Sequence, residues 1–342
     1  MKAVIAHRNG EPRVVQLPEP PLGAHTVQLR VTHCALMLPE EHRIFENLKD
    51  RIPATEEGIP LGMMCSGLID AVGDQVPPRL GLKEGLRVAA FGTPYVYHAT
   101  QLSVPANLVV ELPKKVNHEE GAFAGQGALA LQCLRACGLQ IGESLLVFGG
   151  GMLGQMIAQL ARAAGITPIL VDESDHRLTR ARNVGVTHAV LPEKETLVRE
   201  VDRVTRGLGA DGAILTPDAE STAGHWAVLL LRWRGKLVVH GSAANRLSAR
   251  ALEEKELTLS AVRSAGAGHG DPAYERGAVE YPRHEVRWTV RDNMLVFLDL
   301  LAERKVQVSP LVSDRMPLER APRLYEKIQR APQTVIGATL TV

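Results

Sequence analysis

The stretch "VFGGGMLG", residues 147–154, decides the fold of this chain of 342 residues. The apolar run "SLLVF" leads into the glycines, and "MLGQMIAQLARAAG" follows with helical periodicity. That order predicts a buried strand, a tight turn and a helix. Gly149, Gly151 and Gly154 have the spacing G-x-G-x-x-G. Glycines so placed permit the turn, the approach of a pyrophosphate and close helix–strand packing, so the stretch predicts a dinucleotide site.

The next apolar run, "TPILVD", ends in an acidic residue that bears on the choice of cofactor. Asp172 follows Gly154 by 18 residues. A carboxylate there accepts hydrogen bonds from ribose hydroxyls and repels a 2′-phosphate, which favours NAD over NADP. Arg177 can pack on the adenosine or bind a 2′-phosphate, so NADP stays open. The other candidate cofactor-binding residues follow the glycines or end later strands: Met152, Leu153, Thr216 and Gly241.

The region around this turn alternates between strands and helices. "THAVL", "DGAILT" and "KLVVHG" are short buried strands with helical segments between them, and "KELTLSAV" is the expected last strand. Such alternation is typical of a parallel sheet covered on both faces. We therefore predict a doubly wound Rossmann α/β domain that binds the nucleotide and spans residues 121–286.

The flanking regions are different in character. Residues 1–120 hold short β-like runs such as "KAVIAH" and "TVQLRVT", broken by proline and glycine, which predict a β-rich, barrel-like domain. Beyond residue 286, "TVRDNMLVFLDLLAERK" predicts an amphipathic helix with Thr289 as its N-cap. The final run, "TVIGATLTV", predicts a strand. We expect residues 287–342 to return to the first domain.

Composition narrows the class of protein. Hydrophobic residues make up 45% of the chain, and its formal net charge is +1, which favours neither nucleic acid nor an acidic membrane as a partner. No apolar run is long enough for a membrane helix, and the N-terminus has no signal-peptide pattern. The four cysteines form no C-x-x-C pair. We expect a cytoplasmic protein in a reducing compartment that acts on a small molecule.

These features together resemble the medium-chain dehydrogenase/reductase superfamily, which includes alcohol dehydrogenases. The resemblance covers essentially the whole chain. It implies a GroES-like (chaperonin-10-like) catalytic domain, a Rossmann domain and a tail that returns to the catalytic domain. It also implies hydride transfer with a nicotinamide cofactor, and a homodimer joined through the last Rossmann strand.

Several longer motifs resemble a narrower group, the zinc-lacking dehydrogenase half of bidomain oxidoreductases linked to sugar metabolism. These motifs are "YHATQLSVPANLVVELP", "FAGQGALALQCLRA" and "GDPAYERGAVEYPRHEVRWTVRDNM". The resemblance implies a sugar, cyclitol or polyol as substrate. Two alternatives remain: an NADPH-dependent quinone or enone reductase, and a nucleotide-binding subunit without turnover.

The zinc-ligand positions of the superfamily hold other residues in this chain. Alignment on "VTHCALMLPEEH" puts Met37 at the zinc cysteine, and "LGMMCSG" puts Met63 and Met64 at the histidine and glutamate of G-H-E. Gly125 or Gln126 stands at the last ligand position. Because thioethers bind zinc poorly, we expect no catalytic zinc, with the sulfur side chains filling the pocket. Cu(I) binding is the alternative.

Without zinc, a side chain must exchange the substrate proton. His98 lies in the "YHA" segment, which borders the cleft in the superfamily, and the other reading is a structural strand histidine. His42 stands where zinc relatives have a proton-relay histidine, although a solvated loop is the plainer reading. His240 ends a Rossmann strand and can meet the carboxamide or substrate, or simply point away from the strand end.

The polar, aromatic segment 268–293 supplies one further candidate. The planar guanidinium of Arg287 can clamp a substrate oxygen or carboxylate, or the segment can be a packed connection or dimer contact. Glu40 and Glu41, close to Met37, are expected in a solvated loop.

Overall fold

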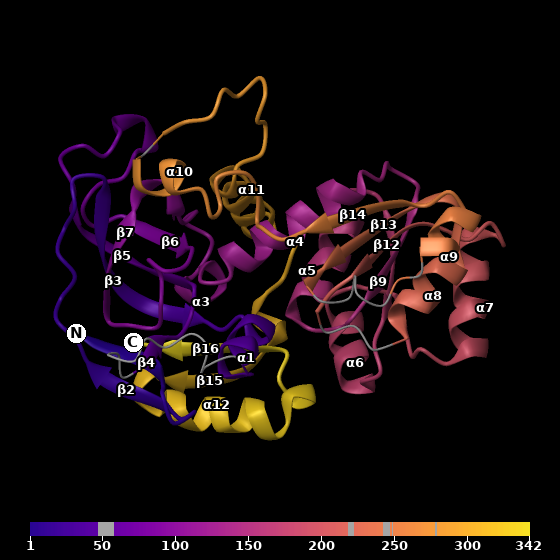
Figure 1. Cartoon of the computed structure of the whole chain (residues 1–342), viewed down its shortest axis with the longest axis horizontal. Coiled ribbons are helices and arrows are strands. Elements are labelled where there is room, and N and C mark those ends of the chain that lie inside the picture. Colours follow the sequence, from indigo (N-terminus) through magenta and orange to yellow (C-terminus); the bar gives the residue numbers. More distant parts are fainter. Residues whose placement is uncertain (47–57, 218–221, 242–246, 248, 278) are drawn as a thin grey trace. The chain divides into compact units, whose positions relative to one another are not determined.

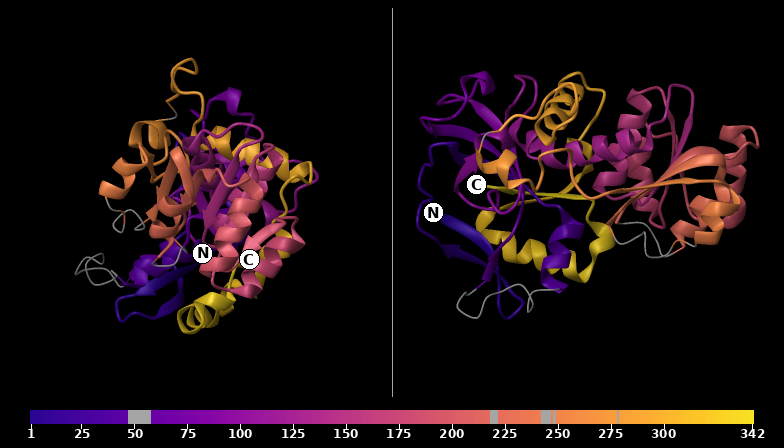
Figure 2. Two further views of the ribbon diagram at one scale, coloured as in Figure 1. Left: turned by 90° about the vertical axis from the view of Figure 1, so that its right-hand side faces the viewer. Right: turned by 45° about the horizontal axis from the view of Figure 1, so that its top comes forward.

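The computed structural model describes residues 1–46, 58–217, 222–241, 247, 249–277 and 279–342. The chain divides into two compact units (Figure 1). Unit 1 comprises Met1–Ala128, Ala265–Ala302 and Val312–Val342, and unit 2 comprises Leu129–Ser264 and Glu303–Leu311. Both termini belong to unit 1, and they lie close together in every view of Figures 1 and 2.

Unit 2 is built on a parallel sheet of six strands in the order β11-β10-β9-β12-β13-β14. The strands are β9 (Ser144–Phe148), β10 (Thr167–Val171), β11 (His188–Val190), β12 (Ala210–Leu215), β13 (Leu231–His240) and β14 (Thr258–Val262). Its helices are α5 (Met152–Ala163), α6 (Asp175–Asn183), α7 (Lys194–Thr205), α8 (Ala223–Leu230) and α9 (Ala249–Glu254). Figure 1 shows helices on both sides of this sheet, which confirms the predicted Rossmann fold.

The core of unit 2 explains why the strands read as continuous apolar runs. Leu146 and Phe148 of β9 and Leu237 and Val239 of β13 are buried in one cluster. Leu197 of α7 and residues of α8 cover that cluster from one face. Strands buried on both faces need apolar residues at every position, which is the pattern that a parallel sheet produces.

Unit 1 holds the β-rich fold expected of residues 1–120. Its larger sheet has the order β15-β16-β3-β5-β6-β8, with β7 paired to β3. These strands are β3 (Thr26–Ala35), β5 (Met64–Val72), β6 (Arg87–Phe91), β7 (Gln101–Pro105), β8 (Val109–Glu111), β15 (Val312–Pro317) and β16 (Gly337–Thr341). The smaller sheet joins β2 (Pro12–Gln16), β1 (Lys2–His7) and β4 (Gly58–Pro60). Because β16 pairs with β3, the predicted return of the tail is confirmed.

The helices of unit 1 are mostly short. They are α1 (Leu38–Glu46), α3 (His118–Gly121), α10 (Pro272–Gly277), α11 (Val290–Ala302) and α12 (Ala321–Arg330), while α4 (Ala124–Cys137) begins in unit 1 and continues into unit 2. Thr289 caps α11 as predicted: its hydroxyl donates to Asp292, and the Asp292 amide donates back at 3.1 Å. Among the described residues, no helix is both long and apolar enough to cross a membrane.

The observed division differs from the expected domain boundaries in three segments. Residues 121–128 and 265–286 were expected in the Rossmann domain but belong to unit 1, and residues 303–311 were expected in the catalytic domain but belong to unit 2. For residues 265–286 the physical reason is a contact between distant parts of the sequence: Asn107 Nδ2 donates to the carbonyls of Tyr274, at 2.7 Å, and Val279, at 3.2 Å. The segment therefore covers unit 1 instead of extending the nucleotide domain.

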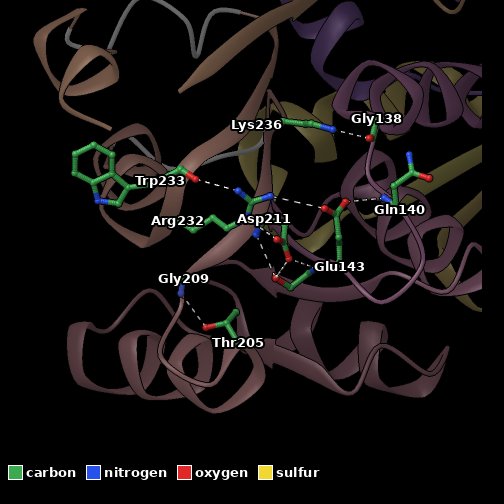
Figure 3. Close-up of polar contacts among 10 residues, drawn as sticks. Gly138, Gln140, Glu143, Thr205, Gly209, Asp211, Arg232, Trp233 and Lys236 are labelled. Atoms are coloured by element: carbon green, nitrogen blue, oxygen red, sulfur yellow. Dashed lines mark hydrogen bonds and ion pairs between the residues drawn. The ribbon is translucent and has the colours of Figure 1, made fainter. Parts of the chain in front are cut away.

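A polar network ties the amino ends of the central strands of unit 2 (Figure 3). The Asp211 carboxylate accepts from Ser144 N at 2.8 Å, from Ser144 Oγ at 2.9 Å and from Arg232 Nε at 2.6 Å. Arg232 also lies 3.7 Å from Glu143. Burial opposes ionisation of Asp211, but the hydrogen bonds from Arg232 and Ser144 lower its pKa below the usual range. The network joins the starts of β9, β12 and β13 at the edge opposite the glycine turn.

Candidate functional site

The glycine turn joins β9 to α5 in unit 2. Gly149 has a φ of +98°, a left-handed conformation that favours glycine. A Cβ on Gly154 would lie 1.8 Å from the Gly149 carbonyl oxygen, and one on Gly150 would lie 2.9 Å from Asp172 Cβ. Gly151 is the N-cap of α5, and Met152 and Leu153 are buried in its first turn. The turn therefore brings bare backbone to the start of a helix, where phosphates bind.

Asp172 lies directly beside this turn, as its spacing predicts. Its Oδ2 accepts from Gly150 N at 2.6 Å, and its Oδ1 accepts from Ser174 N at 2.8 Å. Arg177 Nη1 lies 3.4 Å from Oδ2, so the two predicted side chains are together. Arg177 thus has a carboxylate at hand before any nucleotide binds, and its charge is partly neutralised there.

Gln155 is a residue of this site that the sequence analysis missed. It is fully buried, and its Nε2 donates to the carbonyls of Gly150, at 2.9 Å, and Arg177, at 3.2 Å. One side chain therefore holds the turn and the start of α6 together. A polar residue among the buried positions of α5 is the signal that could have revealed it.

The remaining nucleotide candidates end the strands β12 and β13. Thr216 is fully buried and its hydroxyl donates to Phe148 O at 2.9 Å, so this hydroxyl holds β12 to β9. His240 Nδ1 lies 2.7 Å from Val262 O. Because a carbonyl only accepts, Nδ1 carries the proton, which in the neutral ring leaves Nε2 as an acceptor. Gly241 follows with a φ of +80°. All lie at the carboxyl edge, where open α/β sheets bind ligands.

Unit 1 contains a separate buried polar cluster, formed by Glu41 of α1, His98 before β7, and Tyr325 of α12. His98 Nε2 lies 3.4 Å from Glu41 Oε1, and this oxygen also accepts from Met37 N at 3.0 Å. The Tyr325 hydroxyl donates to Glu41 Oε2. Glu41 is 1% exposed and His98 is 0% exposed. Both oxygens of the Glu41 carboxylate thus have partners, and the His98 imidazole has no contact with solvent.

The electrostatics of this cluster decide the protonation of His98. Burial alone lowers the pKa of the imidazole, but the negative charge of Glu41 and contacts with Glu41 and Cys34 raise the pKa to about 10. At 3.4 Å the His98–Glu41 contact is ionic, and its geometry is not that of a well-directed hydrogen bond. His98 is therefore an imidazolium at neutral pH, able to give a proton but unable to take one.

The loop expected in this region is a helix. Glu40, Glu41 and His42 all lie on α1. His42 is exposed, while Glu41 points inward to His98 and Tyr325. A buried glutamate interrupts the apolar face of the helix, which is why the pattern was misread.

The zinc-ligand positions carry mostly buried, weakly ligating side chains. Met64 is fully buried, Met37 is 5% exposed, Met63 is half-buried, and Gln126 is 4% exposed. No three His, Cys, Asp or Glu side chains within the described ranges converge as metal ligands would. Thioethers and an amide do not meet the preference of zinc for thiolate, imidazole and carboxylate. The residues at this place do not fit a zinc ion.

Two further candidate side chains of unit 1, Arg287 and His269, contact aromatic rings. Arg287, predicted to clamp substrate, is exposed, and its guanidinium lies 3.7 Å from the centre of the Trp288 ring. His269, which the sequence analysis missed, lies 4.8 Å from the Phe91 ring, and its Nδ1 accepts from Ala265 N at 3.2 Å. Phe91 pairs with Met64 across the sheet, so His269 contacts the strand neighbour of a residue at a zinc-ligand position of the superfamily.

A family model described as a zinc-binding dehydrogenase matches residues 153–280. Mouse (Mus musculus) sorbitol dehydrogenase is 23% identical over 355 residues, covering 96% of this chain and 92% of that protein.

Solved structures resemble the whole chain. An Escherichia coli oxidoreductase/dehydrogenase of unknown specificity has a TM-score of 0.82 at 18% identity, covering 99% of this chain and 98% of that chain. Alcohol dehydrogenase from Thermus sp. ATN1 has a TM-score of 0.79 at 23% identity, covering 100% of both chains. These neighbours share the pairing of a GroES-like domain with a Rossmann domain.

Proposed function

We propose that this member of the medium-chain dehydrogenase/reductase superfamily transfers hydride, without zinc, between NAD(H) and a sugar, cyclitol or polyol-type alcohol or ketone. Membership rests on the family match together with the two-unit architecture. The observation that carries the proposal is the glycine turn with Asp172 bonded to its backbone. The match to a sorbitol dehydrogenase over most of both chains supports the class of substrate.

The preference for NAD rests on charge at the adenosine end of the turn. Asp172 places a carboxylate beside Gly150, where a 2′-phosphate would be repelled. Arg177 is the residue that would attract such a phosphate, but it already lies 3.4 Å from the same carboxylate. The ion pair weakens the case for NADP, and Asp172 is the residue that would hold the ribose hydroxyls of a bound NAD.

Zinc independence rests on the donor set. The matched family is named for zinc binding, but the match covers residues 153–280 and leaves out Met37, Met63 and Gln126. Two thioethers and an amide at these positions offer zinc no thiolate, imidazole or carboxylate. No step of the proposed reaction therefore uses a metal.

The nicotinamide cofactor, when bound, supplies or accepts the hydride. The chain must position it and exchange a proton with the substrate oxygen. The start of α5 and the bare turn hold the phosphates, and Asp172 holds the ribose. In carbonyl reduction, His98 is our candidate for the source of the proton, because Glu41 keeps it an imidazolium. His240 Nε2, an acceptor at the strand ends, is our candidate partner for the carboxamide.

Titration of the purified protein with NADH and NADPH tests the cofactor, and metal analysis of the same sample tests zinc independence. We expect tighter binding of NADH, substoichiometric zinc, and turnover of at least one polyol or its ketone. Tighter NADPH binding with reduction of a quinone would favour the quinone reductase. Nucleotide binding without turnover of any polyol or quinone would favour a catalytically silent subunit.

The edge strand β14 bears on the oligomeric state. β14 is the last strand of its sheet, and Thr258, Leu259 and Ala261 are exposed along it. We propose a homodimer joined through this edge, since the outer side of an edge strand offers a row of hydrogen-bonding groups. Light scattering that gives a monomer would refute the dimer. All four cysteines are reduced and buried, in keeping with a cytoplasmic enzyme.

A further inference from the structure

Unit 1 contains a cavity of about 230 Å³ that the proposed reaction does not use. It lies between the segment 274–295 and two short turns around Leu80 and Asn107. The residues that line it include neither the cluster of Glu41, His98 and Tyr325 nor the methionines Met37, Met63 and Met64. The cavity therefore needs its own explanation.

Arg291 forms the charged part of the cavity lining. Its Nη1 donates to the carbonyls of Val109 and Ala106, and its Nη2 donates to Leu80 O at 3.3 Å. A guanidinium has five N–H groups, so Nε–H and one Nη2–H have no hydrogen-bond partner within the described ranges. Burial lowers the pKa of Arg291, but an arginine stays charged. The direct hydrogen-bond partners of this cation are carbonyl oxygens, and the neighbouring Asp292 carboxylate also stabilises its charge.

The other charged residues of the lining neutralise one another. Arg79 lies 2.9 Å from Glu280, while Arg283 lies 3.4 Å from Glu280 and 3.8 Å from Asp292. Three arginines therefore face two carboxylates, and one positive charge remains. That charge belongs to Arg291, which has no ion pair with a carboxylate in the described part of the chain.

Part of the cavity wall is aromatic and aliphatic. The rings of Tyr274 and Tyr281 are stacked, 5.3 Å apart and 6° from parallel. The Tyr281 hydroxyl donates to Asp271, which fixes the ring orientation. Val279 is 48% exposed and Leu295 is 37% exposed on the same lining. Exposed apolar side chains stand beside a guanidinium that has no direct ion pair with a carboxylate. This combination suits a ligand with one anionic end and one apolar face.

We propose that this cavity binds a small carboxylic acid with a ring, whose carboxylate meets Arg291 and whose ring lies against Tyr281 and Leu295. Arg291 supplies the charge-assisted, planar contact that a carboxylate prefers. A hydrophobic acid and a sugar acid share this chemistry, and the probes below separate them. The site is distinct from the nucleotide turn, so binding does not depend on the reaction proposed above.

Calorimetry on the full chain tests the site, with benzoate and glucuronate as probes and benzyl alcohol and glucose as uncharged counterparts. We expect one of the two acids to bind, with and without NAD, and its counterpart to bind at least about tenfold more weakly. Benzoate binding assigns a hydrophobic acid, and glucuronate binding assigns a sugar acid. Binding of neither acid, or equal binding of acid and counterpart, would overturn the proposal.

Three variants locate the binding. Arg291→Met removes the charge, and we expect it to weaken acid binding by about tenfold or more. Leu295→Trp fills the cavity from a partly exposed helix position, and it decides the question should Arg291→Met not fold. Arg323→Met, on the exposed face of α12, is the matched control and should leave binding unchanged. Undiminished binding in Leu295→Trp would refute the cavity as the site.

Discussion

The Nε2 atom of His98 lies 3.4 Å from Oε1 of Glu41, and the two side chains are 0% and 1% exposed. A buried ion pair is costly to form, and it is still more costly to break from one side. The Tyr325 hydroxyl and the Met37 amide donate hydrogen bonds to the same carboxylate. Removal of one partner of this pair should therefore strongly destabilise unit 1.

The first prediction concerns the charge of Glu41. Glu41→Gln removes the negative charge but keeps the shape, so His98 is left buried without a counter-ion. We expect the free energy of unfolding to fall by about 3 kcal/mol, measured by urea denaturation at pH 7. Glu40→Gln, the neighbouring residue whose partner Arg43 is exposed, is the control and should lie within about 1 kcal/mol of the parent. Equal losses of unfolding free energy in Glu41→Gln and Glu40→Gln would show that the buried pair stabilises the fold no more than an exposed one.

The second prediction follows from the raised pKa of His98. In the folded chain the pKa is about 10, whereas an unperturbed histidine has a pKa of about 6.5. The folded state therefore binds more protons between these values, so stability falls as pH rises through this window. The contribution is fully present below about pH 6.5 and lost above about pH 10. Tyr325 stays neutral throughout, because burial and Glu41 raise its pKa.

Urea denaturation of the parent chain and Glu41→Gln across this range measures the effect. The difference in unfolding free energy should be largest near pH 6 and should shrink as pH approaches 10. A difference that stays constant with pH would mean that the folded pKa of His98 is not raised. The same variants report on the reaction: loss of Glu41 lowers the pKa of His98, so the proton donor is deprotonated, and activity is lost, at a lower pH than in the parent.

These residues also show where sequence reasoning stops. The turn at 147–154, Asp172 and the Thr289 cap were predictable because each depends on neighbours a few residues or one βα unit away. The contact of Glu41 with His98 and Tyr325 joins segments far apart in the chain. A buried glutamate on a short helix has no periodic signature, so local patterns indicated a solvated loop instead.

The segment 265–286 illustrates the same limit. Its attachment to unit 1 depends on Asn107, a residue of a short turn whose amide reaches two carbonyls across the fold. Gln155 and His269 were missed for a related reason, because each is defined by the backbone groups that it contacts. Resemblance to a family identified the fold, while these contacts needed coordinates.

The third prediction concerns the network in Figure 3. Asp211→Asn removes a charged acceptor that serves Ser144 and Arg232 at the amino ends of three strands. We expect a loss of about 1–3 kcal/mol in unfolding free energy, because a half-buried arginine is left without its closest carboxylate. Nucleotide affinity should change little, since the glycine turn lies at the opposite edge of the sheet.

Glu256→Gln provides the matched control for this network. Arg234 and Glu256 are also an arginine–carboxylate pair, 2.7 Å apart, but their side chains are 77% and 55% exposed. Solvent screens such a pair, so its loss should cost no more than about 1 kcal/mol. If Asp211→Asn cost as little as the exposed control, the network would not stabilise the sheet.

The last prediction concerns cofactor choice. Asp172→Ser removes the carboxylate beside the turn while keeping a small polar side chain that can accept from Gly150 N. Affinity for NADH should fall on the order of tenfold, through loss of the ribose contacts, and affinity for NADPH should rise, because Arg177 is freed from its 3.4 Å contact with the acid. Fluorescence titration with both cofactors measures the two constants. Asp175→Ser, an exposed acid three residues on, should leave both unchanged. Should the ratio of the two constants stay fixed in Asp172→Ser, the discrimination between the cofactors must come from elsewhere in the site.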